Sequence, residues 1–247
     1  EDKKTYRSTK PGAKEYTSPT YPSYDLSIQD QARADAWISE FNGFVKTGVM
    51  PALQIFHLPN DHTAGAKAGM PTPAACFADN DLALGRILET LSNSPFWKDT
   101  VVFVVEDDSQ SGPDHVDSHR SVLLVMSAYN RSGVQHRFVN TTDVIATIEG
   151  ILGIGSLSQF DHFGRPLYEV FSDKPDLTPY KAIVPEQSLT ELNPENKNAQ
   201  NSLKLRLEKE DLSDDDLFNR ILWAAIKGDQ VPYPGDSRIS LLQLQQE

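Results

Sequence analysis

The run Thr100-Val101-Val102-Phe103-Val104-Val105 constrains the fold of this 247-residue chain more than any other stretch. It is apolar after its first residue and rich in β-branched valine, so it predicts a strand. Because no polar residue alternates with the apolar ones, both faces of the strand must be covered, which is typical of a sheet with helices on both sides. The run ends abruptly in Glu106-Asp107-Asp108.

Two further apolar runs, residues 52–57 and 122–126, predict strands of the same sheet. Apolar residues at helical spacing predict helices over four stretches: 28–44, 77–92, 141–152 and 213–227. We expect Thr141 or Thr142 to cap the third helix and Gly153 to end it. For the last helix we expect Ser213 and the acids after it to form the start, and Lys227-Gly228 the end. Helices alternating with strands predict an α/β fold.

The chain divides by composition into an arm and a domain. Residues 1–27 are rich in Lys, Tyr, Ser, Thr and Pro, which predicts an extended arm or linker. Residues 28–247 form the domain, with a loop-rich segment at about 154–212 and a closing helix at about 213–228. No apolar run approaches the roughly 18 residues of a membrane span, so we expect no transmembrane segment.

Charge and cysteine content exclude several classes of function. The formal charge of −12 argues against a nucleic-acid binder or an anionic-membrane binder, because both need a basic face. It does not exclude an anionic substrate at a metal centre, since the metal supplies positive charge. Cys76 is the one cysteine, so the chain has neither an internal disulfide nor a zinc site made of thiolates.

Acids and histidines gather where two of the predicted strands end. Asp61-His62 follows the 52–57 run, and acids with two more histidines follow the 100–105 run. Sites in open α/β sheets lie at the carboxyl ends of strands, and adjacent acids there are tolerable if a cation neutralises them. Four of the six histidines lie in or beside these segments: His57, His62, His115 and His119. The pattern favours a metal or catalytic site.

Each of these signals also has a plainer explanation. An Asp-His pair in a loop is often only a turn, and Asp-Asp after a strand is often a solvated turn or a helix cap. We interpret His57, inside an apolar run, as a packed core residue. We interpret Asp79 and Asp81 as caps of the helix that starts near residue 77.

Three stretches resemble a known family: 58–65 (LPNDHTAG), 96–100 (FWKDT) and 106–121 (EDDSQSGPDHVDSHRS). They strongly resemble a bacterial phosphoesterase family of the alkaline phosphatase superfamily, near its phospholipase C and acid phosphatase branch. The resemblance covers roughly residues 24–185. It implies an α/β fold with an alkaline-phosphatase-like mixed or parallel central sheet flanked by helices. It also implies metal-dependent hydrolysis of phosphate esters, and a periplasmic or extracellular location.

The resemblance implies roles for seven residues. The metal ligands would be Asp107, Asp108, His62 and His119, with Asp61 beside them, while Arg120 and His115 would contact the phosphate. Carboxylate with imidazole suits zinc or manganese, and carboxylate with water suits magnesium or calcium. We expect divalent metal ions, zinc first, and a small-molecule or lipid phosphate ester as substrate.

One part of the family's site has no counterpart here. The family's site also needs an upstream strand with an acid or amide ligand, and a Ser or Thr nucleophile. Residues 1–27 hold hydroxyls but no apolar strand, so no catalytic nucleophile is identified. We therefore expect the C-terminal portion of a larger phosphoesterase, lacking N-terminal strands and inactive alone. Its partners would be an upstream segment or β-propeller of the same protein, or a second copy paired at the open sheet edge.

Two other functions stay open at this point. The chain could be a non-catalytic metal- or anion-binding module of a cell-surface protein, or a sulfatase-like hydrolase that uses the same ligands on sulfate esters. An upstream strand, acid ligand and nucleophile in the gene would favour the phosphoesterase.

Overall fold

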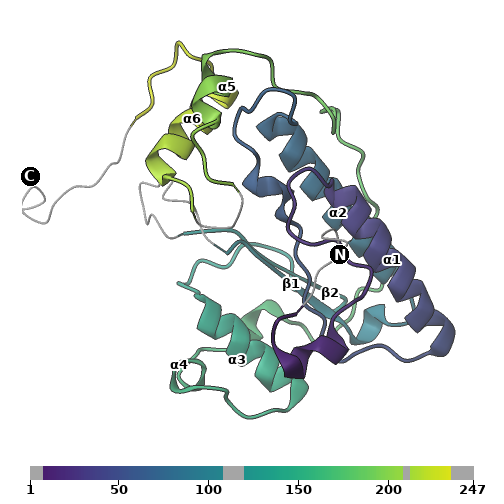
Figure 1. Cartoon of the computed structure of the whole chain (residues 1–247). Coiled ribbons are helices and arrows are strands. Elements are labelled where there is room, and N and C mark those ends of the chain that lie inside the picture. Colours follow the sequence, from purple (N-terminus) through teal and green to yellow (C-terminus); the bar gives the residue numbers. More distant parts are fainter. Residues whose placement is uncertain (1–7, 108–119, 208–211, 235–247) are drawn as a thin grey trace, which may run out of the picture.

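The structure, a computed structural model, describes residues 8–107, 120–207 and 212–234 (Figure 1). Helix and strand are mixed, which agrees with the α/β class at that coarse level. The elements in chain order are the 3-10 helix η1 (Pro11–Tyr16), α1 (Asp30–Thr47), η2 (Pro59–His62), α2 (Pro73–Ser92), η3 (Trp97–Asp99), β1 (Val101–Val105), β2 (Leu123–Ser127), α3 (Thr141–Leu152), α4 (Gln159–His162), η4 (Tyr168–Val170), α5 (Lys197–Ser202) and α6 (Asp215–Lys227).

Strands β1 and β2 pair antiparallel, with Val101 opposite Ser127 and Val105 opposite Leu123. They are the two strands of the sheet in the described ranges, so the mixed or parallel sheet that the resemblance implies is not seen there. The runs 100–105 and 122–126 do form strands, as predicted.

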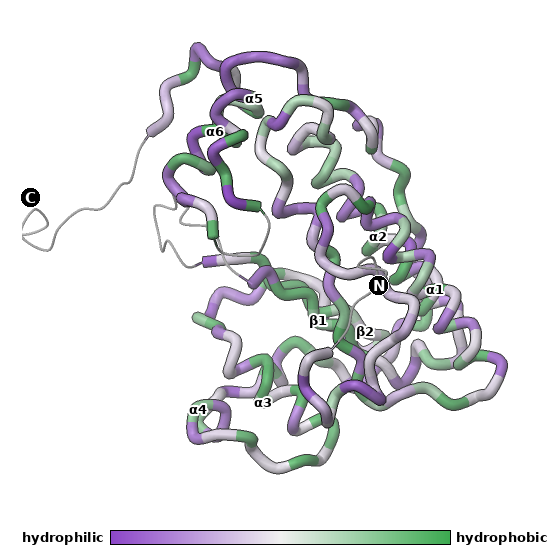
Figure 2. Tube along the Cα trace, viewed as in Figure 1, coloured by the Kyte–Doolittle hydropathy of each residue, from purple (hydrophilic) through white to green (hydrophobic). Residues whose placement is uncertain are grey.

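Helices lie on both faces of this ladder. Val102 and Val104 of β1 pack with the cluster of α1 and α2, while Phe103 packs with the cluster around Val144 of α3. Side chains alternate between the two faces of a strand, so an unbroken apolar run serves both clusters. Figure 2 shows β1 and β2 as a hydrophobic stretch between the two helical layers. Both faces of β1 are therefore covered by helices, as its apolar sequence predicted.

The prediction of a third strand over residues 52–57 is wrong, because this segment has no regular secondary structure. Phe56 is half-buried and packs on the first cluster, whereas its neighbour Ile55 is 88% exposed. The segment thus alternates in burial as a strand would, but no described strand hydrogen-bonds to it. His57 is exposed as well, so its interpretation as a core residue is also wrong.

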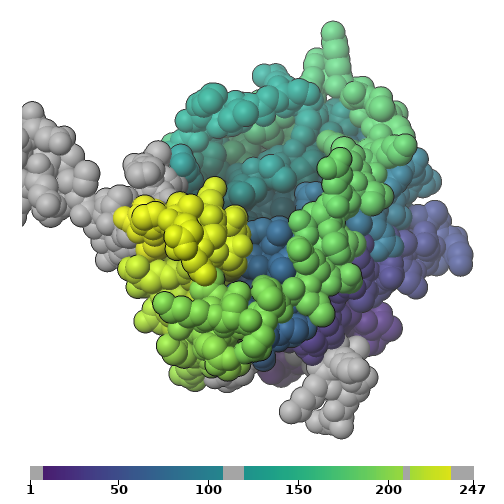
Figure 3. Space-filling view, turned by 90° about the horizontal axis from the view of Figure 1, so that it is seen from above, coloured from purple at the N-terminus to yellow at the C-terminus, as the bar shows by residue number. Residues whose placement is uncertain are grey.

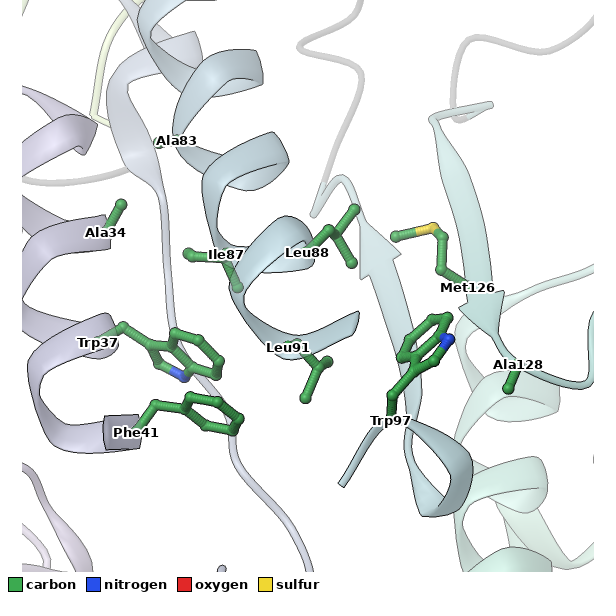
Figure 4. Packing of buried hydrophobic residues seen from close by; sticks show 10 residues of the cluster. All are labelled: Ala34, Trp37, Phe41, Ala83, Ile87, Leu88, Leu91, Trp97, Met126 and Ala128. Carbon is green, nitrogen blue, oxygen red and sulfur yellow. The ribbon is translucent and has the colours of Figure 1, made fainter. Parts of the chain in front are cut away.

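The larger core lies between α1, α2 and the ladder (Figure 4). Trp37 stacks on Phe41 with ring centroids 4.7 Å apart. Figure 4 shows both rings facing Ile87 and Leu91 of α2, with Trp97 on the side toward β2. The apolar residues of α1 recur at helical spacing, which is why its face toward α2 is buried.

Helix α2 starts earlier than its pattern predicts. Thr72 accepts a hydrogen bond from the backbone of Ala75, and Pro73 occupies the first turn. Pro suits this position because its missing N–H needs no partner there. The interpretation of Asp79 and Asp81 as caps of this helix is therefore wrong, and Asp79 lies buried inside it.

Two other caps differ from the prediction. Helix α3 spans the predicted residues and ends at Gly153, but its cap is Asn140, which forms a reciprocal capping box with Asp143. The closing helix α6 is capped by Asp214, not by the Ser213 hydroxyl, and it ends at Gly228 as predicted. Asn is a better cap than Thr, whereas Asp and Ser cap about equally well.

The described part of the predicted arm is not wholly extended. It includes η1, and its later residues fold back on α1 and on residue 57. Arg33 donates to the carbonyls of Ser23 and Asp25, and the Tyr21 hydroxyl donates to the carbonyl of His57 at 2.7 Å. Among the described residues, no helix is long and apolar enough to cross a membrane.

Candidate functional site

Asp61 and His62 lie in η2, which follows the segment 52–57 and Leu58. Pro59 and Asn60 of this turn are buried, while Asp61 and His62 are half-buried. The backbone N–H of His62 donates to the Asp61 carboxyl, and the N–H of Thr63 donates to the carbonyl of Asn60 at 2.9 Å. A rigid turn thus presents these two chemically active side chains.

The Asp61 carboxyl meets Glu106, the first residue after β1. The Glu106 side chain lies close enough to the Asp61 carboxyl to lower its pKa. Burial raises the pKa of Asp61 above its ordinary value, and the contact with Glu106 and the charge of His57 act in the opposite direction. Two carboxyl groups can share such a contact only if a proton lies between them or a cation stands with them. The turn at Asp61 and the end of β1 therefore meet in space.

Asp107 and Arg120 flank the same end of the ladder. The N–H of Glu106 donates to the carbonyl of Val122 at 3.0 Å, and the Ser121 hydroxyl donates to the carbonyl of Glu106 at 3.1 Å. These bonds extend the β1–β2 pairing past the strand ends. Both Asp107 and Arg120 are exposed there. Figure 2 shows the trace turning from hydrophobic to hydrophilic at this end.

The remaining predicted site residues, Asp108, His115 and His119, lie outside the described residues. Within the described ranges, no three His, Cys, Asp or Glu side chains form a group that could hold a metal ion. The meeting of Asp107, Asp108, His62 and His119 at one point therefore stays a prediction.

The His62 ring is held by three neighbours. Its Nδ1 lies 3.1 Å from the carbonyl oxygen of Thr63, and its centroid lies 5.3 Å from that of Phe218 on α6. The ring of Tyr24 meets it edge-on at 6.0 Å. In the tautomer that donates from Nδ1 to the carbonyl, Nε2 carries the lone pair that a metal or a proton would take.

Thr63 adopts a strained backbone. Its φ of 60° and ψ of 168° fall in a region that is essentially reserved for glycine, and its side chain is buried. The Thr63 hydroxyl accepts from the N–H of Gly65 at 3.0 Å. Strain of this kind persists only where the surroundings impose it, and it concentrates at functional sites. The strained backbone of Thr63 is therefore a second reason, besides the Asp61–Glu106 contact, to consider this loop a candidate site.

The carboxyl-terminal helices cover the loop from the other side. The N–H of Ala66 donates to the Ser202 hydroxyl at 2.9 Å. A Cβ on Gly65 would lie 3.0–3.3 Å from side chains of Leu205, Ser202 and Ile221, so only glycine fits at this φ of 61°. Figure 3 shows a hollow in this face, with the blue part of the chain at its floor and α6, in yellow, at its rim.

The sequence pattern did not identify Glu106, or the buried residues behind the Asp61 turn, as part of the site. Glu106 precedes Asp107 and Asp108 in the sequence, and its position at the end of the predicted strand could have identified it. The buried carboxylates Asp30 and Asp79, which hold Asn60, gave no comparable signal because their partners lie 19 to 49 residues away in sequence. No family model, no curated protein and no solved structure matches the chain.

Proposed function

We propose that this chain carries part of the active site of a metal-dependent phosphate ester hydrolase. The single observation behind the proposal is the contact between the Asp61 and Glu106 carboxyls, which joins the ends of two separate segments. A divalent cation would relieve the repulsion between two such groups. The motifs 58–65 and 106–121, which resemble the phosphoesterase family, contain these two residues.

The donor types of these residues suit a metal, and residues outside the described ranges would have to complete the group of ligands. Carboxylate oxygens of Asp61 and Asp107, with the imidazole of His62, are donors that suit zinc first, and manganese, magnesium or calcium next. Asp108 and His119 would complete the set. A bound divalent cation would polarise phosphoryl oxygens and offset the charge that develops on them. The guanidinium of Arg120, at the same end of the ladder, would orient the phosphate with His115.

The rest of the family's architecture belongs to the same proposal. The antiparallel pair β1–β2 would be one part of a larger alkaline-phosphatase-like sheet, and an upstream segment would supply the Ser or Thr nucleophile. Sheets usually have more than two strands, which supports a larger sheet; the helices on both faces are enough to stabilise the pair as it stands. The enzyme would act on small-molecule or lipid phosphate esters in the periplasm or outside the cell.

Activity of the full gene product tests the proposal. We expect zinc- or manganese-dependent hydrolysis of p-nitrophenyl phosphate, removal of activity by a chelator, and restoration by added metal. Asp107→Asn should reduce hydrolysis to background. The matched control is Asp99→Asn at the opposite end of β1, where the Asp99 carboxylate is exposed and 3.9 Å from Lys98; it should leave the rate unchanged.

Three outcomes would count against the proposal. Full activity in the Asp107→Asn variant would remove the proposed ligand. Hydrolysis of p-nitrophenyl sulfate but not of the phosphate would identify a sulfatase-like enzyme. Metal binding without hydrolysis of either ester would identify a non-catalytic module.

A further inference from the structure

A set of buried polar residues lies directly behind the Asp61 turn. Asp30, Arg33, Asn60 and Asp79 are each at most 4% exposed, and they come from α1, η2 and α2. None of them has a part in the proposed chemistry. Burying charged groups is costly unless they are paired and hydrogen-bonded, so this set has to be held by specific contacts.

Asp79 joins three elements through one carboxylate. Its Oδ2 accepts from the backbone N–H of Asp30 at 2.6 Å and from the side-chain amide of Asn60 at 2.7 Å. Its Oδ1 accepts from the N–H of Gln31 at 3.4 Å. The residue before α1, Gln29, provides no side-chain cap, so Asp79 of α2 caps α1 in its place.

Asp30 holds the same turn through the backbone. Its Oδ2 accepts from the N–H of Asn60 at 3.0 Å and from the Asn80 amide at 3.2 Å. Its Oδ1 accepts from Arg33 at 3.1 Å. Burial raises the pKa of Asp30 to about 6, against the Asn60 hydrogen bond and the Arg33 charge.

Asn60 is therefore held at both its backbone and its side chain by two carboxylates. Reversing its amide would place Oδ1 against the Asp79 carboxylate, which fixes the orientation of the side chain. The next peptide carries Asp61, and the Asn60 carbonyl accepts from the N–H of the strained Thr63. The conformation from residue 60 to residue 63 is thus set from the buried side.

We propose that Asp79 is a positioning residue for the metal site: by holding Asn60 it directs the Asp61 carboxylate toward Glu106. This inference rests on the proposed function, because it assigns Asp79 to the same metal site. Outer partners that orient metal ligands typically contribute about 10- to 100-fold in metal affinity. A merely structural Asp79 would change the stability of the fold and leave the metal affinity alone.

The test compares two variants with a matched control. Asp79→Asn keeps the size of the side chain but turns an amide N–H₂ toward one of its donors. Asn60→Ala removes the same contact and leaves Asp79 free to cap α1, so it serves if the first variant fails to fold. The control is Asp35→Asn, which breaks another α1–α2 contact, the exposed ion pair with Arg86, five residues further along α1 than Asp30.

Zinc affinity is measured by competition with a chromophoric chelator, and stability by urea unfolding. We expect Asp79→Asn and Asn60→Ala to bind zinc at least tenfold more weakly than Asp35→Asn, with the double variant no weaker than the poorer single one. Variants that lose stability but bind zinc like the control would overturn the positioning role. A wild-type chain that binds no zinc would overturn the metal site itself, and this role with it.

Discussion

The carboxylate of Asp143 offers the most direct test of how the α3 layer is held together. It is 2% exposed, and it accepts from the N–H of Arg165 at 2.7 Å and from the N–H of Asn140 at 3.4 Å. The guanidinium of Arg137 lies 3.2 Å away and that of Arg165 3.3 Å away. One carboxylate thus completes the capping box of α3 and joins the helix to the segment after α4.

The substitution Asp143→Asn keeps the shape and removes the charge. Hydrogen bonds to a buried charged group contribute roughly 1.5–3 kcal/mol, whereas an exposed ion pair such as that with Arg165 contributes under about 1 kcal/mol. The new amide would also place an N–H₂ against N–H donors. We expect the free energy of unfolding to fall by about 2–3 kcal/mol.

The stability that the Asp143 carboxylate contributes should depend on pH. Burial raises the pKa of Asp143, but the backbone donors and the two guanidinium groups outweigh it and hold the pKa below its ordinary value. A carboxyl with a lowered folded-state pKa stabilises the fold above the unfolded-state pKa of about 4, and this stabilisation is lost as the pH falls further. The difference between wild type and Asp143→Asn should therefore be full at pH 7 and smaller at pH 3.

Urea unfolding followed by tryptophan fluorescence measures both quantities. The control is Asp216→Asn, which breaks the exposed pair with Arg220 on α6 and should change the free energy of unfolding by about 0.5 kcal/mol or less. Equal stabilities of wild type and Asp143→Asn, or a difference that does not shrink between pH 7 and pH 3, would show that the charged Asp143 does not stabilise the α3 layer.

Three further predictions concern packing. Burial raises the pKa of the Cys76 thiol to about 12, so we expect it to react with a thiol reagent at neutral pH only after urea unfolds the chain; fast reaction of the folded protein would contradict this. Gly164→Ala would bring a Cβ within 2.6 Å of the Thr142 carbonyl and should lower the unfolding midpoint, while Gly155→Ala, with open space, should not. Phe218→Ala should cost about 3–5 kcal/mol of stability, because the ring is buried between α6 and the Asp61 turn; a loss under 1 kcal/mol would show that α6 is not packed there.

The sequence predicts those parts of the fold whose physics is local. The apolar run of β1 predicted a strand with both faces covered, because successive side chains point to opposite faces and all of them are apolar. Alternate residues of β1 pack into the two hydrophobic clusters. Helix α3 has the predicted bounds, since its glycine stop and periodic pattern are both local. Residues 52–57 show the limit: they alternate in burial like a strand, but a strand also needs a partner, and no local pattern specifies one.

The same limit applies to the candidate site. Asp61 and Asp107 could be singled out because each follows an apolar run. The role of Asp79 could not, because an acid early in a helical pattern looks like a cap of its own helix. It caps α1 instead, 49 residues upstream, through a contact that exists only after α1 and α2 have packed.

The most direct test of the metal site is an anomalous difference map at the zinc edge, from crystals of the protein grown with Zn²⁺. We predict a peak about 2.0–2.2 Å from a carboxylate oxygen of Asp61, with Asp107 among the other ligands, and no peak at that place in Asp61→Asn crystals. A zinc-free Asp61 that remains in contact with Glu106 in the presence of the metal, or a zinc ion bound elsewhere with Asp61 and Asp107 apart, would contradict it.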